Sequence, residues 1–261
     1  MGKYGDRLFV STEAERQRLA SLELAYDQGS FDTLSQVAIK THWHCLELGA
    51  GAGSVARWLA AQVPDGMVTA TDIDTRFLGD LQAENVRVRR HDLVTEEFPE
   101  ATFDLIHARL LLSHLPERAN ILRKLFRWLK PGGVLVVEGM CWYPVNATEN
   151  DVYRTGMNAY DKATATLVGT DSSFMQRLPA LLGELGYVDV GVDLHGHVVQ
   201  GGTPVADMWR RTVAMSRERA IEAGLATHAD FDAFEELMHD PTFFGHGPVM
   251  AGTWGYRPEQ V

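Results

Sequence analysis

A glycine-rich turn between an apolar run and an amphipathic stretch constrains the fold of this chain more than any other feature. The run Cys45–Leu48 is followed by glycines at alternate positions, Gly49, Gly51 and Gly53. Glycine lets a backbone turn sharply and approach a ligand without a Cβ in the way, and the start of a helix offers free amide donors. The sequence therefore predicts a strand, a tight turn and a helix that together hold a nucleoside-type ligand.

Short apolar runs alternate with helical patterns from residue 44 to residue 139, as expected for parallel βα units. The predicted strands are 44–48, 67–72, 86–90, 103–108 and 133–139. The predicted helices between them are 54–62, 75–84 and 117–130. Further along, we expect a helix over 174–185 and strands over 187–194 and 249–257. The pattern predicts an α/β fold with a mostly parallel seven-stranded sheet and helices on both faces.

Three helical segments lie outside this alternation. Residues 1–40 predict an N-terminal helical cap, with a helix from Glu13 to Gln28, Gly29 as its end, and a second helix from Phe31 to Ile39. Residues 141–171 and 206–247 predict lid insertions. No repeat or linker separates these segments, so we expect one elaborated domain over residues 1–261.

Composition limits the partners of the chain. Its 24 Lys and Arg against 35 Asp and Glu give a formal net charge of −11, which argues against nucleic acid as a partner. No run reaches the roughly 18 to 20 apolar residues that span a bilayer, and Met1 to Val10 lacks the apolar core of a signal peptide. We expect a cytoplasmic protein without a membrane partner, in which Cys45 and Cys141 are reduced thiols.

Two aspartates follow later predicted strands. Asp72 lies 19 residues after Gly53, where a carboxylate can accept hydrogen bonds from both hydroxyls of a ribose. Asp92 could accept one from an adenine amino group, and a role in forming the turn fits almost as well. The same βαβ unit serves nicotinamide dehydrogenases, but Ser54 replaces their third glycine and Glu47 precedes the loop.

These features, together with Phe103–Arg109 and Leu129–Leu135, resemble the class I S-adenosylmethionine-dependent methyltransferases. The segment Gly252–Pro258 is similar to the last strand of small-molecule methyltransferases from actinomycete natural-product pathways. The resemblance implies a Rossmann-like methyltransferase fold that uses S-adenosyl-L-methionine and releases S-adenosyl-L-homocysteine. It also implies an enzyme that transfers the methyl group in line to a small molecule of secondary metabolism.

Carried over residue by residue, the resemblance implies a set of cofactor-binding positions. These are Glu47, Gly49, Ala50, Gly51, Gly53, Asp72, Ile73, Asp92, Leu93, Ala108 and Arg109. Asp72 would bind the ribose, Ile73 would pack on the adenine, and the carbonyl of Ala108 would hold the methionyl amino group. A structural salt bridge fits Arg109 as well as a contact with the cofactor carboxylate.

The acceptor pocket is predicted from aromatic and similar residues in the two insertions. The candidates are Trp142, Tyr143, Met157, Tyr160, Trp209 and His246. His114 is a candidate general base, although no spacing singles it out. His195 and His197 alternate along a strand end without a third ligand, so no metal site is expected.

Two alternatives and one assembly stay open at this point. The chain could bind S-adenosylmethionine and catalyse a step without methylation, such as a cyclisation or rearrangement. A nicotinamide dehydrogenase is the weaker alternative. A homodimer is compatible with lid helices of this kind.

Overall fold

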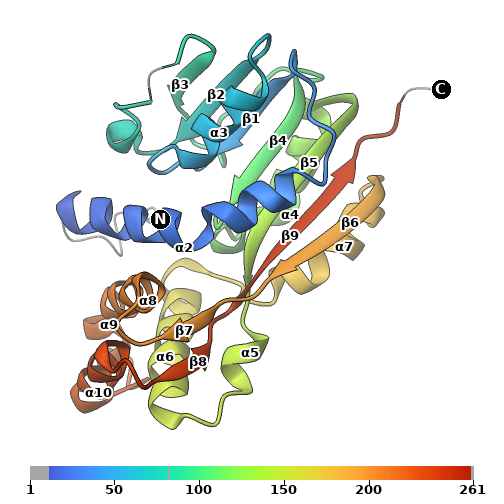
Figure 1. The fold of residues 1–261 in the computed structure, drawn as a ribbon. Coiled ribbons are helices and arrows are strands. Elements are labelled where there is room, and N and C mark those ends of the chain that lie inside the picture. Colours follow the sequence, from blue (N-terminus) through green and yellow to red (C-terminus); the bar gives the residue numbers. More distant parts are fainter. Residues whose placement is uncertain (1–11, 82, 260–261) are drawn as a thin grey trace.

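The computed structural model describes residues 12–81 and 83–259 (Figure 1). The α-helices are α2 (Thr12–Leu34), α3 (Ser54–Gln62), α4 (Arg118–Trp128), α5 (Tyr143–Asn146), α6 (Asp151–Val168), α7 (Phe174–Glu184), α8 (Pro204–Ala214), α9 (Arg217–Glu222) and α10 (His228–His239). The short 3₁₀ helices are η1 (Thr75–Phe77) and η2 (Leu112–His114). The strands are β1 (His44–Leu48), β2 (Met67–Asp72), β3 (Val86–Arg90), β4 (Phe103–Arg109), β5 (Leu129–Cys141), β6 (Val188–His195), β7 (Val198–Gln200), β8 (Phe244–His246) and β9 (Val249–Tyr256).

The seven longer strands form one sheet in the order β3-β2-β1-β4-β5-β9-β6. Strands β1 to β5 are parallel, and β9 lies antiparallel between β5 and β6. This confirms the predicted seven-stranded, mostly parallel sheet. Because β1 pairs with β2 on one side and with β4 on the other, the strand order reverses there. In open α/β sheets such a switch point leaves a crevice at the carboxyl ends of the strands.

Each face of the sheet has its own apolar core, since successive strand residues point to opposite faces. Cys45, Leu105 and Val134 pack on the face that α3 covers. Leu46 and Ile106 pack on the other face, against residues of α4 and α7. Helices therefore cover both faces, as predicted.

A third apolar cluster joins α6, α8 and α10 and includes Met157, Trp209 and Phe234. These helices lie beyond the carboxyl ends of the parallel strands, and α2 crosses between them and the sheet (Figure 1). Strands β7 and β8, which the sequence pattern did not predict, pair antiparallel beside this cluster. The sheet and the helices of the two predicted insertions thus have separate cores.

Helix α2 differs from the prediction. It runs without interruption from Thr12 to Leu34, so the predicted helix end at Gly29 is wrong, and Phe31–Ile39 is not a separate helix. A Cβ on Gly29 would lie 3.2 Å from Cγ of His195. The glycine therefore allows β6 to approach the helix closely. Residues 1–11 of the predicted cap lie outside the described residues.

Two further differences have local causes. The predicted helix over 75–84 is reduced to η1, because the chain turns at the exposed residues Gly79 and Asp80 while Leu78 stays buried. Strand β5 is longer than predicted at both ends. Among the described residues, every helix is too short or too polar to cross a bilayer.

Candidate functional site

The loop after β1 turns into α3 through left-handed glycines. Gly49 and Gly51 have φ of 66° and 57°, values that side chains with a Cβ rarely adopt. A Cβ on Gly51 would also lie 3.3 Å from Leu19 of α2. The glycine therefore lets the loop pass close to α2.

Asp72 at the end of β2 is tied directly to this loop. Its Oδ2 accepts a hydrogen bond from the Gly51 amide at 3.0 Å, and its Oδ1 accepts one from the Asp74 amide at 3.0 Å. Burial raises the pKa of the Asp72 carboxyl, and these amides oppose the rise. Asp92 follows β3 and accepts a hydrogen bond from the Val94 amide at 3.1 Å. A carboxylate has about four lone-pair sites, so Asp72 has capacity for a further donor.

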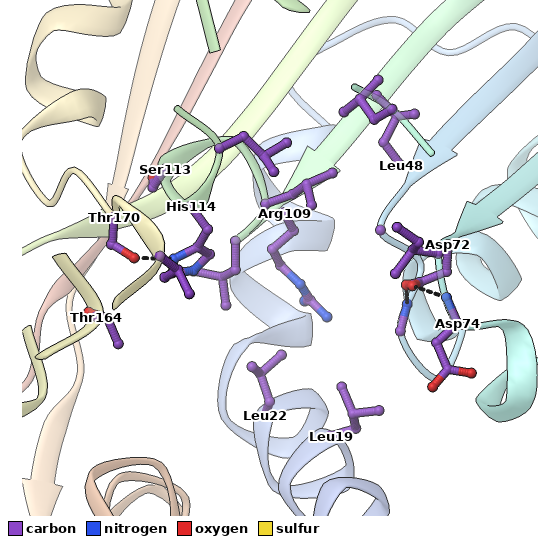
Figure 2. A pocket seen from close by; sticks show the side chains of 18 of the residues that line it. Leu19, Leu22, Leu48, Asp72, Asp74, Arg109, Ser113, His114, Thr164 and Thr170 are labelled. Atoms are coloured by element: carbon purple, nitrogen blue, oxygen red, sulfur yellow. Dashed lines mark hydrogen bonds between the residues drawn. The ribbon is translucent and has the colours of Figure 1, made fainter. Parts of the chain in front are cut away.

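A cavity of about 1250 Å³ opens at these strand ends and extends to α6 and α8. These two helices and α10, which share one apolar cluster, are the lid helices, and that cluster is the lid core. Asp72 lies on one side of it and His114 on the other, with Arg109 between them in the view of Figure 2. The predicted cofactor residues that line it are Gly49, Ala50, Gly51, Asp72, Ile73, Asp92, Leu93 and Arg109. Of the described residues predicted for the cofactor, Glu47, Gly53 and Ala108 do not line it.

Glu47 instead belongs to a buried cluster of charges, the Glu47–His107–Glu138 triad. His107 Nδ1 lies 2.6 Å from Glu47 Oε2, and His107 Nε2 lies 2.8 Å from Glu138 Oε2. Burial disfavours the charged imidazole, but the two carboxylates more than offset this and raise the pKa of His107 to about 9. His107 is therefore an imidazolium at neutral pH. Burial raises the pKa of Glu47, whereas the imidazolium outweighs burial at Glu138 and lowers the pKa of that carboxyl.

The sequence prediction missed His107 and Glu138. A signal was present, because Glu47, His107 and Glu138 each interrupt a run of apolar residues near the carboxyl end of a strand. Parallel pairing places Glu47 opposite His107 and Glu138 opposite Arg109. The three strand ends thus carry complementary charges.

Arg109 links the sheet to α2. Its Nη1 donates to Asp27 Oδ1 and to Ser30 Oγ, both at 2.9 Å. Ser54, the first residue of α3, donates from Oγ to the same Asp27 oxygen at 3.0 Å. Of the two roles that fitted Arg109 from sequence, the structure shows the salt bridge, and the side chain also lines the cavity.

His114 ends η2 and faces the cavity. Its Nδ1 lies 2.9 Å from Thr170 Oγ1, a contact that fixes the plane of the ring (Figure 2). Burial, with the positive charges of Arg18 and Arg118, lowers the pKa of His114 to about 4. The imidazole is therefore neutral at physiological pH and can accept a hydrogen bond.

Half of the predicted acceptor residues meet at the cavity wall. Trp142, Tyr160 and Trp209 line it and contact one another, with the Trp142 and Trp209 ring centroids 5.7 Å apart. The other half lie elsewhere in the described structure. Tyr143 is 73% exposed, Met157 is buried in the lid core, and His246 is exposed on β8.

The other titratable side chains that the sequence singled out have structural surroundings. His195 Nε2 lies 3.2 Å from Thr33 Oγ1, and the His197 ring packs on Tyr26 of the same helix. Both histidines face α2, and within the described residues no group of three metal-ligating side chains forms. Cys45 is buried, Cys141 is partly buried, and both are free thiols.

Comparison with known sequences assigns the central part of the chain. A family model for a methyltransferase domain matches residues 46–135. The methyltransferase str2 of Strobilurus tenacellus is 33% identical over 137 residues, which are 52% of this chain and 49% of that protein. The chain therefore spans about half the length of this curated relative.

Comparison with solved structures covers most of the chain. The YcgJ protein of Bacillus subtilis superimposes with a TM-score of 0.62 at 17% identity, over 90% of this chain and 100% of that chain. Phosphoethanolamine N-methyltransferase 2 of Haemonchus contortus, solved with S-adenosyl-L-methionine, also gives 0.62 at 17% identity, over 99% of this chain and 61% of that chain. These likenesses confirm the Rossmann-like methyltransferase fold. With the family match, they show that residues 46–135 carry a methyltransferase domain within a chain that has this fold.

Proposed function

We propose that this protein transfers a methyl group from S-adenosyl-L-methionine to a small-molecule acceptor and releases S-adenosyl-L-homocysteine. The observation that carries the proposal is the hydrogen bond between the Gly51 amide and the Asp72 carboxylate beside a cavity of about 1250 Å³. That bond sets a glycine loop and an acidic strand end at the switch point of the sheet, where this fold binds nucleosides.

The residues around the loop suit the cofactor of the family. Asp72 uses two lone pairs on backbone amides and keeps others for the ribose hydroxyls. Ile73 and Leu93 offer apolar contacts to the adenine, and Asp92 offers an acceptor for its amino group. A side chain at position 51 would press against Leu19 of α2. The bound cofactor supplies an electrophilic methyl group on a positively charged sulfur.

The lid half of the cavity suits an organic acceptor. Sites for one ligand usually have roughly 300 to 1,000 Å³, so about 1250 Å³ leaves room for a second molecule beside the cofactor. Trp142, Tyr160 and Trp209 give this half aromatic walls. Methyl transfer gains from in-line placement of the nucleophile and from exclusion of water, and an apolar enclosure provides both.

His114 is proposed to orient the acceptor. A group with a pKa of about 4 is too weak a base to hold a proton at neutral pH. As a neutral imidazole fixed by Thr170, it can accept a hydrogen bond from a hydroxyl or amine and aim that group. We therefore assign His114 to orientation of the acceptor.

Calorimetry with S-adenosyl-L-methionine tests the cofactor site. Asp72→Ala should weaken binding about 5- to 150-fold, which corresponds to ~1–3 kcal/mol for a lost charged hydrogen bond. Asp80→Ala is the matched control, because Asp80 is an exposed carboxylate on the turn after η1 and should leave binding unchanged. Equal effects of the two variants, or no binding by the wild type, would refute the proposed site.

Turnover with methyl-labelled cofactor tests the reaction. Incubation with a panel of small hydroxyl and amine compounds should move the label to one of them. A product that forms without label transfer would instead support a cyclisation or rearrangement. Binding of a nicotinamide nucleotide in place of the labelled cofactor would support a dehydrogenase.

A further inference from the structure

The Glu47–His107–Glu138 triad lies on three neighbouring strands of the sheet, close to the carboxyl ends from which the cavity opens. Its side chains come from β1, β4 and β5, and each is 2% exposed or less. A neutral imidazole has one N–H and one lone pair, so it could donate to one carboxylate only. The charged ring with a donor at each nitrogen satisfies both. With Glu47 and Glu138 both ionised, the triad therefore keeps both contacts only while His107 holds two protons.

The triad connects to the glycine loop through the backbone of its acidic members. Glu47 lies two residues before Gly49, and its carbonyl accepts a hydrogen bond from Thr71 Oγ1 at 2.9 Å. The Thr71 carbonyl in turn accepts one from the Ala50 amide at 2.9 Å. A shift of Glu47 would therefore displace the loop.

A second connection runs through the turn after β4. The Glu138 carbonyl accepts a hydrogen bond from the Leu110 amide at 2.8 Å. Leu110 has a φ of 54°, a left-handed conformation that costs about 1 to 3 kcal/mol at a residue other than glycine. The next side chain, Leu111, fills the space that a Cβ on Gly49 would need, 3.2 Å away. Glu138 thus helps to hold a strained turn against the loop.

We propose that His107 is a positioning residue that clamps Glu47 and Glu138 together and thereby holds the Gly49–Gly53 loop and the Leu110 turn in the shape that receives the cofactor. The inference rests on the proposed function for the identity of that ligand. The clamp itself is a property of the ligand-free protein. None of the three side chains lines the cavity, so His107 acts through other residues.

The charges around His107 predict how the clamp depends on pH. Glu47 of β1 and Glu138 of β5 face the ring, Arg109 of β4 lies near both carboxylates, and Asp27 of α2 pairs with Arg109. Removal of the second proton at high pH would leave a lone pair facing a carboxylate. The clamp should therefore hold below the pKa of His107 and open above it.

Hydrogen exchange in the ligand-free protein tests the clamp, and calorimetry with S-adenosyl-L-methionine tests its consequence. His107→Gln replaces the ring by an amide with donors at one end only. His44→Gln is the matched control: His44 begins the same β1 strand at its opposite end and contacts Thr69 Oγ1 at 2.9 Å. Glu138→Gln is a milder second variant if His107→Gln does not fold.

We expect exchange to rise about tenfold in peptides over residues 46–54 and 108–112 of His107→Gln, as for a buried polar group left without a partner. Peptides over α10 and the whole of His44→Gln should stay at wild-type rates. Affinity for the cofactor should fall about tenfold in His107→Gln. In the wild type alone, affinity should decline further as the pH rises through 9.

Unchanged exchange in both peptides, or an equal rise in all peptides, would overturn the clamp. A cofactor affinity with the same pH profile in wild type and His107→Gln would overturn it too. Failure of the wild type to bind the cofactor would refute the proposed function instead, while the exchange comparison would still decide the clamp.

Discussion

The ion pair between Arg109 and Asp27 gives a prediction whose magnitude follows from unequal burial. The Arg109 side chain is 9% exposed and that of Asp27 is 21% exposed. Removing one partner of a buried pair costs about 3 to 5 kcal/mol, because the other charge is left buried without compensation. The two substitutions should differ, since the two charges have different surroundings.

Asp27→Ala leaves Arg109 beside the triad, in which Glu47 and Glu138 both interact favourably with the guanidinium. We expect that substitution to lower the free energy of unfolding by about 2 kcal/mol, below the buried-pair range, since solvent and the triad compensate the guanidinium. Arg109→Met removes a cation that interacts with Asp27, Glu47 and Glu138 together, and leaves these acids without it. It should cost about 3 to 4 kcal/mol.

Urea unfolding of both single variants and the double variant measures these terms and their coupling. The coupling between Asp27 and Arg109 should be about 1 to 2 kcal/mol. Asp232→Ala is the control, because its partner Arg217 forms an exposed pair at 2.6 Å that should contribute less than about 1 kcal/mol. Additive single effects, or a larger loss in Asp27→Ala than in Arg109→Met, would refute the electrostatic account.

Three further predictions concern the loop, the triad and the lid. Gly51→Val should abolish cofactor binding in calorimetry while circular dichroism shows that the protein stays folded. The position has a positive φ that valine rarely adopts, and the added side chain would contact Leu19 of α2. Retained affinity would show that the loop is not part of the site. The pKa of His107 is raised from 6.5 to about 9 on folding, so its stabilisation is complete below pH 6.5 and is lost as the pH rises through 9. Melting temperatures from pH 6 to 10 should show this decline in the wild type and a smaller one in His107→Gln. Gly156→Ala should destabilise the lid by about 1 to 3 kcal/mol, because its Cβ would lie 2.4 Å from the Phe234 ring. Gly183→Ala, in α7 with open space around it, should instead stabilise by up to about 1 kcal/mol, and thermal unfolding of the pair distinguishes packing from helix propensity.

Local pattern was sufficient to predict the elements that build the sheet. Strands 44–48, 67–72 and 86–90 and helix 54–62 were predicted to the residue, because apolar alternation and turn residues agree there. The helix end at Gly29 was wrong since glycine has two uses, as a helix end and as a site of close approach. Only the tertiary position of His195 decides between them.

The predicted acceptor residues show the same limit inside one helix. Met157 and Tyr160 both lie on the buried face of α6, and the sequence pattern predicts equally for both that they line the cavity. In the fold, Tyr160 lines the cavity and Met157 packs in the lid core. A helix that is covered on more than one side buries residues against each neighbour. Its periodicity therefore predicts burial but not which neighbour each residue meets.

Prediction of the triad would have required the order and register of the strands as well as the residues that they contain. A single charged residue in an apolar strand has no stable partner within its own strand, since neighbouring side chains point to opposite faces. Its partner comes from an adjacent strand, as for His107, or from a helix beside the sheet, as for Arg109 and Asp27, and the strand order decides which strand residues are within reach. Once β4 lies between β1 and β5, His107 is the residue that can reach acids on both sides. Charged residues near the carboxyl ends of three strands that are neighbours in the sheet therefore predict a buried network. The order of those strands determines which residue lies in the middle of that network.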